Sequence, residues 1–190
     1  MIAPPDHYEV NVLIGIPIRK HTQLYGVGAP GAYTATTPDG VGDCFRACIA
    51  TILGTTNIAD VPHFAWQRNI DEYHAGHTLP SHDVTLARRW LRHTHHIDLA
   101  YLERAHIHPD ATWIATVNSA AHPGGAHAVV GRNNTIIFDP SSTDPALCRY
   151  TTNDIHPDDT VALTLVEPYD PDPDLMSLWW TAGLTDTEGL

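Results

Sequence analysis

Residues 43 to 54 read Asp-Cys-Phe-Arg-Ala-Cys-Ile-Ala-Thr-Ile-Leu-Gly, and this stretch decides the fold. Its apolar side chains recur at the spacing of one helix face: Phe45, Cys48, Ile49 and Ile52. Gly54 is a typical helix stop. The sequence therefore predicts a buried helix whose first residue is Cys44.

Further helices and then a series of strands are expected after this stretch. The pattern predicts a short helix from about Val61 through Tyr73 and a longer one that opens at Ser81. After His96 the sequence changes to short β-branched or alternating runs: Leu99 to Leu102, Thr112 to Val117, Ala126 to Val130, Thr135 to Phe138 and Val161 to Val166. Helices followed by strands predict the α+β class with an antiparallel sheet.

The length of 190 residues predicts one domain, with a distinct segment at each end. Residues 1 to 40 are expected to form a lead-in, with a β-leaning run from Tyr8 to Ile18 and a glycine-rich loop after it. Residues 168 to 190 form an acidic, proline-rich tail, in which the apolar residues around Trp179 allow a short docked helix.

The charge balance argues against two classes of partner. With 22 acidic and 10 basic side chains, the formal net charge is -12, so the average surface repels phosphate backbones and anionic lipid headgroups. We expect no nucleic acid and no membrane as partner. The first ten residues lack the basic start and apolar core of a secretory signal, so a cytoplasmic protein with reduced cysteines is expected.

Cys44 is the candidate nucleophile. A thiol attacks as its thiolate, and a helix N-terminus favours that anion through its unpaired N–H groups and partial positive charge. Cys48 lies one turn deeper on the same face, where apolar surroundings keep a thiol protonated. Taken alone, Cys44 is better explained as a small core residue of a hydrophobic helix. Its assignment therefore depends on other residues.

His127 and Asp139 lie on two runs that are expected to pair as a hairpin. His127 opens a β-run after a glycine turn, and Asp139 ends the next run. The step Arg132-Asn133-Asn134 between the runs suits a tight turn, which brings the end of the second strand beside the start of the first. An Asp in that place accepts the proton of one imidazole nitrogen and leaves the other to face a thiol.

Plainer explanations exist for these residues as well. His127 alone fits a strand histidine bonded to a backbone carbonyl, and Asp139 before a proline fits the start of a turn. His122 is a rival base, but it lies in a loop before Pro123. The other histidines show no zinc-finger or metalloprotease spacing: His74, His77, His93, His95, His96, His106 and His108. We expect no metal and no other cofactor.

Three blocks of the sequence together resemble a known family. They are Gly42-Asp43-Cys44-Phe45-Arg46-Ala47-Cys48, His127-Ala128-Val129-Val130-Gly131 and Phe138-Asp139-Pro140. In this order they look like the active-site blocks of papain-like cysteine peptidases, and most of all like the compact bacterial branch that includes the bacteriocin-processing peptidases. The resemblance covers residues 36 to 142 and is specific only when the three blocks are taken together.

The resemblance implies a papain-like fold, in which the nucleophile helix packs against an antiparallel β-sheet and an active-site cleft lies between two lobes. It also implies a catalytic triad of Cys44, His127 and Asp139, a peptide or protein substrate, and amide hydrolysis through a thioester. Two alternatives stay open. One is acyl transfer or glutamine deamidation by the same thioester route, and the other is a catalytically silent papain-like module that binds a partner.

One feature of the family is missing near Cys44. The family usually places a Gln a few residues before the nucleophile, where its amide helps to hold the oxyanion. Residues 36 to 43 contain neither Gln nor Asn, which leaves Gln23 of the lead-in as the candidate donor beside the backbone N–H of Cys44. Asp43 must turn away or cap the helix, because a carboxylate next to the thiol opposes its ionisation.

Overall fold

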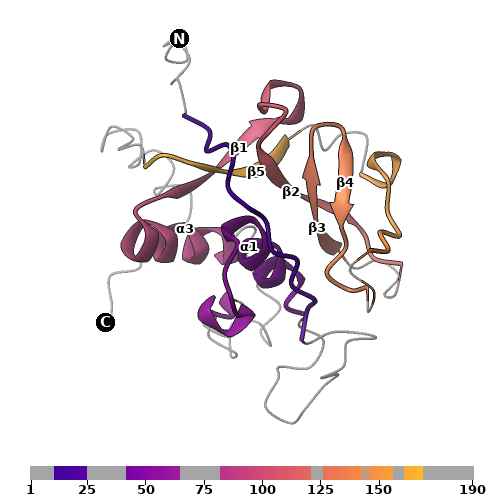
Figure 1. Cartoon of the computed structure of the whole chain (residues 1–190), viewed down its shortest axis with the longest axis horizontal. Helices are drawn as coiled ribbons and strands as arrows, with labels where there is room; N and C mark the ends of the chain where they lie inside the picture. The colour runs from indigo at the N-terminus through magenta and orange to yellow at the C-terminus, as the bar shows by residue number, and fades with distance from the viewer. Residues whose placement is uncertain are drawn as a thin grey trace.

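Five antiparallel strands form one sheet and two α-helices pack on it within the part of the chain that this computed structural model describes (Figure 1). The described residues are 11–24, 42–64, 82–120, 126–142, 144, 146–155 and 161–168. The helices are α1 (Cys44–Leu53) and α3 (His82–His95), and the strands are β1 (Asp98–Glu103), β2 (Thr112–Asn118), β3 (Ala126–Arg132), β4 (Thr135–Phe138) and β5 (Val161–Val166). The predicted α+β class with an antiparallel sheet is confirmed.

Helix α1 begins at Cys44, as the sequence predicts, and ends at a glycine cap. Gly54 has a φ of 65°, in the left-handed region, and its N–H donates to the Thr51 carbonyl oxygen at 3.1 Å. A Cβ atom on Gly54 would overlap the Pro17 carbonyl oxygen, so the lead-in backbone passes directly over this end of the helix. The sides of α1 that carry Cys48 and Ile49 are fully buried.

Helix α3 is fixed to the sheet by charge as well as by apolar contact. The buried carboxylate of Asp98 on β1 accepts hydrogen bonds from Arg88 at 2.9 and 3.0 Å and from Arg92 at 2.8 Å. Ala87 and Leu91 of α3 are fully buried in the same core as α1. The helix predicted from Ser81 is confirmed over its described residues. Neither α1 nor α3 has the length and apolar character needed to cross a membrane, and the described residues contain no other candidate.

The short helix predicted from Val61 through Tyr73 is wrong at its start. Val61, Pro62 and His63 have non-helical backbone, and they follow a single 3-10 turn at Ile58–Asp60. The Arg46 side chain holds this segment against α1, because its Nε donates to the Val61 carbonyl oxygen at 2.7 Å. Residues 65 to 73 of the predicted helix lie outside the described residues.

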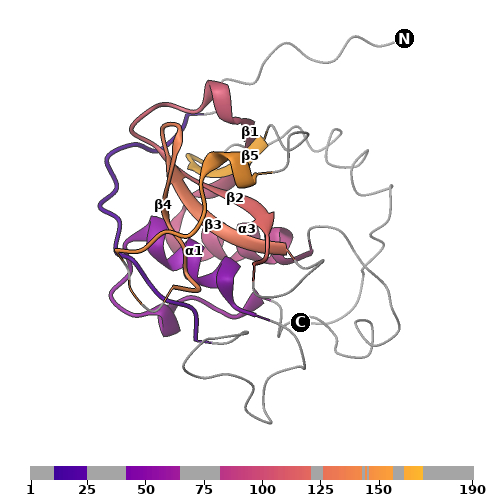
Figure 2. The same cartoon turned by 90° about the vertical axis from the view of Figure 1, so that its right-hand side faces the viewer.

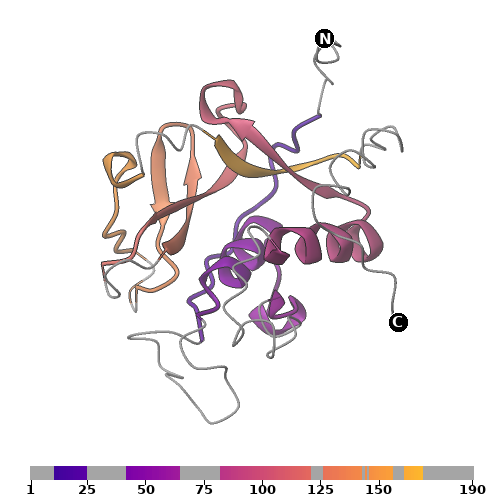
Figure 3. The same ribbon diagram turned by 180° about the vertical axis from the view of Figure 1, so that it is seen from behind.

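The strand order is β1-β5-β2-β3-β4, and alternate side chains build a core on each face of the sheet. Helices α1 and α3 lie on one face of the sheet (Figures 2 and 3), and there they share a core with strand residues such as Ile114 and Val130. On the other face, Trp113 and Val129 pack with Tyr150, which follows β4. Helices α1 and α3 thus share a core with one face of the sheet. The two-lobed arrangement with a cleft stays a prediction.

The lead-in crosses the molecule as an extended segment beside α1 (dark indigo in Figure 1). Leu13 N–H donates to the Leu165 carbonyl oxygen of β5 at 2.9 Å, and Gln23 N–H donates to the Pro140 carbonyl oxygen at 2.8 Å. The strand predicted from Tyr8 to Ile18 is wrong over residues 11–18, which form only an isolated bridge to β5. Gly15, with a φ of 73°, and Pro17 prevent a continuous series of backbone hydrogen bonds to β5. The docked helix suggested near Trp179 lies outside the described residues.

Candidate active site

Cys44 lies at the N-terminus of α1, partly exposed, against the start of β3. Its Sγ accepts a hydrogen bond from the backbone N–H of Ala128 at 3.5 Å. This N–H is available because β4 pairs only with Val130–Arg132, further along β3. By contrast, burial raises the pKa of the Cys48 thiol well above its usual value, so Cys48 stays protonated as expected. Cys44 is therefore the thiol of α1 that a substrate can reach.

His127 and Asp139 form a buried hydrogen-bonded pair next to Cys44. His127 Nε2 lies 2.8 Å from Asp139 Oδ1, and both side chains are buried. The hairpin predicted from the sequence brings them together, since β4 returns along β3 and ends one residue before Asp139. Because Nε2 is committed to the carboxylate, the Nδ1 side of the ring is left for Cys44. The structure thus brings all three sequence-predicted residues to one place.

The electrostatic balance keeps a proton on His127. Burial alone would lower the pKa of its imidazole, but the hydrogen bond to Asp139 and the contact with the Cys44 side chain raise the pKa to about 9. The ring is therefore an imidazolium at neutral pH. A cation at this position stabilises negative charge on the neighbouring sulfur. His127 thus holds a proton before a substrate arrives, instead of waiting as a neutral base.

Asp139 is held in the charged form by more donors than the sequence indicates. Oδ1 accepts the backbone N–H of Ser141 at 2.9 Å and its hydroxyl at 2.6 Å, and Oδ2 accepts Arg149 Nε at 3.0 Å. Arg149 also donates to the Ser141 hydroxyl. Burial would raise the pKa of the Asp139 carboxyl, but His127, Ser141 and Arg149 together hold it well below its usual range. The anion that orients His127 is therefore permanent.

Sequence reasoning missed Ser141, Arg149 and Tyr150. Ser141 carries a local signal, because an Asp side chain often accepts the N–H two residues later in the chain. Tyr150 is buried beside the imidazole, with its ring centroid 5.5 Å from that of His127, and its hydroxyl accepts the Ala120 N–H at 3.0 Å. No pattern marks Arg149 or Tyr150, because both belong to a segment without regular secondary structure.

Gln23 lies at the same end of the sheet as this pair. Its backbone is tied to Pro140, the residue that follows Asp139, and its side chain is only 4% exposed. Its Oε1 is buried and has no hydrogen-bond partner among the described residues. An amide oxygen accepts hydrogen bonds, so this unpaired atom does not bear on the Nε2 donor that an oxyanion needs, and the role considered for Gln23 stays a prediction.

Asp43 does not cap α1, which was one of the two arrangements expected for it. The carboxylate is buried and makes no capping hydrogen bond to α1. Instead its Oδ2 lies 3.5 Å from Arg46 Nη1. The positive charge of Arg46 thus offsets the carboxylate that precedes Cys44.

The other histidines show no site of their own among the described residues. There, no group of three or more His, Cys, Asp or Glu side chains could hold a metal ion. His93, His95, His96, His106 and His108 are exposed. Burial, aided by the charge of Arg46, lowers the pKa of His63 to about 4. His74, His77 and the rival base His122 lie outside the described residues.

In comparisons with known proteins, no family model, curated protein or solved structure matches this chain. The resemblance to papain-like peptidases is therefore carried by the three sequence blocks alone.

The raised pKa of His127 provides a direct test of the site. Asp139→Asn is expected to lower this pKa well below the value of about 9, because burial then acts without the opposing charge. NMR titration of the His127 ring measures the change. Asp144→Asn, at an exposed position, is the matched control and should leave the titration as it is. An unchanged titration in Asp139→Asn would contradict the assigned pair.

Proposed function

We propose that this protein is a cysteine hydrolase of papain-like type that cleaves a peptide or related amide bond through a thioester. Cys44 is the nucleophile, His127 the proton carrier and Asp139 the residue that orients it. One observation carries the proposal: a buried His127–Asp139 pair adjoins a partly exposed thiol at a helix N-terminus. A histidine with a purely structural role would need neither the raised pKa nor the contact with a partly exposed sulfur.

The first half of the reaction is acylation of the thiol. The Cys44 sulfur attacks the substrate carbonyl carbon, and the π electrons of that bond move onto the oxygen. As the tetrahedral intermediate collapses, His127 gives its Nδ1 proton to the departing nitrogen, and the C–N bond breaks. An amine leaves and a thioester stays on Cys44. Asp139 keeps the ring in place through Nε2 during this transfer.

The second half is hydrolysis of the thioester. His127, now neutral, takes a proton from water at Nδ1 while the water oxygen attacks the thioester carbonyl. The Cys44–acyl bond breaks, the acid product leaves, and the sulfur regains its negative charge beside the imidazolium. Acyl transfer and deamidation use the same intermediate, and they differ in the acceptor or in the amide that is attacked.

Two groups are suited to hold the oxyanion. The N–H of Cys44 belongs to the first turn of α1, where backbone donors lack helical partners; the first backbone bond there is Ala47 N–H to Asp43 O at 2.9 Å. The Nε2 amide group of Gln23 is the second, since the side chain is buried and its backbone is anchored at Pro140. The Asp43–Arg46 ion pair weakens one of the two reasons for a silent binding module, and a donor role of Gln23 would remove the other.

The nucleophile is tested by alkylation. Iodoacetamide at mildly acidic pH is expected to label Cys44 at least about tenfold faster than Cys48 or Cys148, because only Cys44 faces an imidazolium. Peptide mass spectrometry gives the three rates. Cys148 is the matched control because it is also partly exposed and burial raises the pKa of its thiol. Labelling of Cys44 no faster than Cys148 would exclude the hydrolase.

The role of Gln23 is tested by two reactions at the same sulfur. Gln23→Ala is expected to slow acylation of Cys44 by p-nitrophenyl acetate about 100-fold, the usual cost of one oxyanion donor. Alkylation by iodoacetamide passes through no oxyanion and should keep its rate. Release of nitrophenolate and intact mass report the two rates. Equal acylation rates in both proteins, or a parallel loss of both reactions, would remove Gln23 from the oxyanion site.

A further inference from the structure

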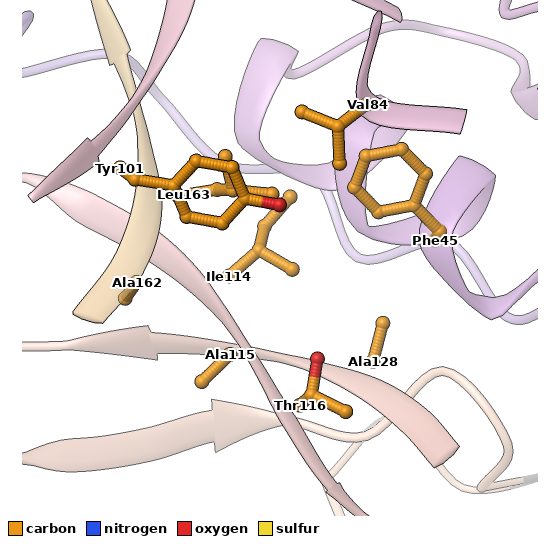
Figure 4. A pocket seen from close by; sticks show the side chains of 9 residues that line it. All are labelled: Phe45, Val84, Tyr101, Ile114, Ala115, Thr116, Ala128, Ala162 and Leu163. Carbon is orange, nitrogen blue, oxygen red and sulfur yellow. The ribbon is translucent and has the colours of Figure 1, made fainter. Parts of the chain in front are cut away.

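A small pocket lies on the helix-covered face of the sheet (Figure 4). Its volume is about 110 Å³. The wall is formed by α1, α3 and four strands, through residues that include Phe45, Val84, Tyr101, Thr116, Ala128 and Leu163. The reaction proposed above uses none of these side chains.

Two residues of the pocket wall adjoin the reacting groups. Phe45 directly follows Cys44, and Ala128 directly follows His127. The backbone N–H of Ala128 contacts the Cys44 sulfur, and Thr116 on β2 is the cross-strand partner of Ala128. A substrate whose carbonyl carbon meets the sulfur therefore has a neighbouring side chain within reach of this space.

The lining defines the chemistry of what fits. None of the described residues that line the pocket is charged, and the side-chain polar atoms in Figure 4 are the hydroxyls of Tyr101 and Thr116. A charged side chain would lose its hydration there without gaining a partner. An apolar cavity of about 150 Å³ is known to accept benzene, so the smaller volume here favours an aliphatic side chain over an aromatic ring.

The inner wall of the pocket is held in place by packing. The Phe45 ring lies 6.1 Å from the Phe64 ring, which lies 6.0 Å from Trp90 of α3. Phe64 is buried, so this chain of rings fixes Phe45 between the two helices. Tyr101 forms the opposite side and is 54% exposed, which leaves the pocket open to solvent there.

We infer that this pocket is the specificity pocket of the hydrolase and holds an aliphatic substrate side chain, of Val or Leu size, from a residue at or next to the cleaved bond. The inference rests on the proposed function. It adds a substrate class, because the pocket selects an uncharged aliphatic residue beside the scissile amide.

The probes are acetyl-dipeptidyl chloromethyl ketones that carry Gly, Leu, Phe or Glu at either of the two positions next to the ketone. The Cys44 sulfur displaces chloride from each probe, and intact mass spectrometry gives the rate. Leu at one of the two positions is expected to react at least about tenfold faster than Gly, the effect of filling an apolar pocket. Phe and Glu should give no such gain. Equal rates for Leu and Glu at both positions would overturn the inference.

Thr116→Leu fills the pocket from the exposed strand position 116. It is expected to abolish the preference for the Leu probe over the Gly probe. Thr94→Leu makes the same change at an exposed α3 position outside the pocket and should keep the preference.

A preference that survives Thr116→Leu would assign the selectivity to another place and overturn the inference. The probe series on the unmodified chain tests the inference even if this variant fails to fold. Labelling by iodoacetamide distinguishes a failure of the proposed function from a failure of this inference. If Cys44 reacts no faster than Cys148, the proposed function falls and this inference falls with it. If Cys44 is reactive but unselective, only the inference falls.

Discussion

The hydrogen bond between His127 and Asp139 is the interaction on which the rest of the site depends. Burial opposes charge on both partners, so neither could remain ionised there alone. Each is stabilised by the other, and Ser141 and Arg149 supply the remaining donors to the carboxylate. The pair therefore keeps the imidazole protonated inside the protein, where its positive charge stabilises negative charge on the neighbouring sulfur.

The fold supplies this arrangement through a few backbone constraints. The hairpin of β3 and β4 sets the distance between His127 and Asp139. The shortness of β4 leaves the Ala128 N–H for the sulfur, and the shared core of helix and sheet holds the first turn of α1 at that point. The lead-in then passes over the end of α1 and delivers Gln23 to the same end of the sheet. Residues from four separate segments thus meet in one place.

Local patterns in the sequence were sufficient for the elements that place the triad. Helical periodicity with a terminal glycine located α1, and two β-runs around a tight turn located the hairpin. The supporting residues escaped prediction because their positions are tertiary. Arg149 bonds to Asp139 ten residues away, and the next residue, Tyr150, packs into the core on the far face of the sheet. The predicted lead-in strand and the helix from Val61 were wrong where short apolar runs contain proline, whose effect outweighs the pattern.

The contact between Cys44 and His127 is tested most directly by NMR titration of the His127 ring with and without the thiol. In the unmodified chain the pKa of His127 should lie at about 9. In Cys44→Ala it should be lower, because the Cys44 side chain is one of the groups that raise it. Identical titration curves in the two proteins would show that the imidazole is charged without help from the sulfur, and they would contradict the proposed site.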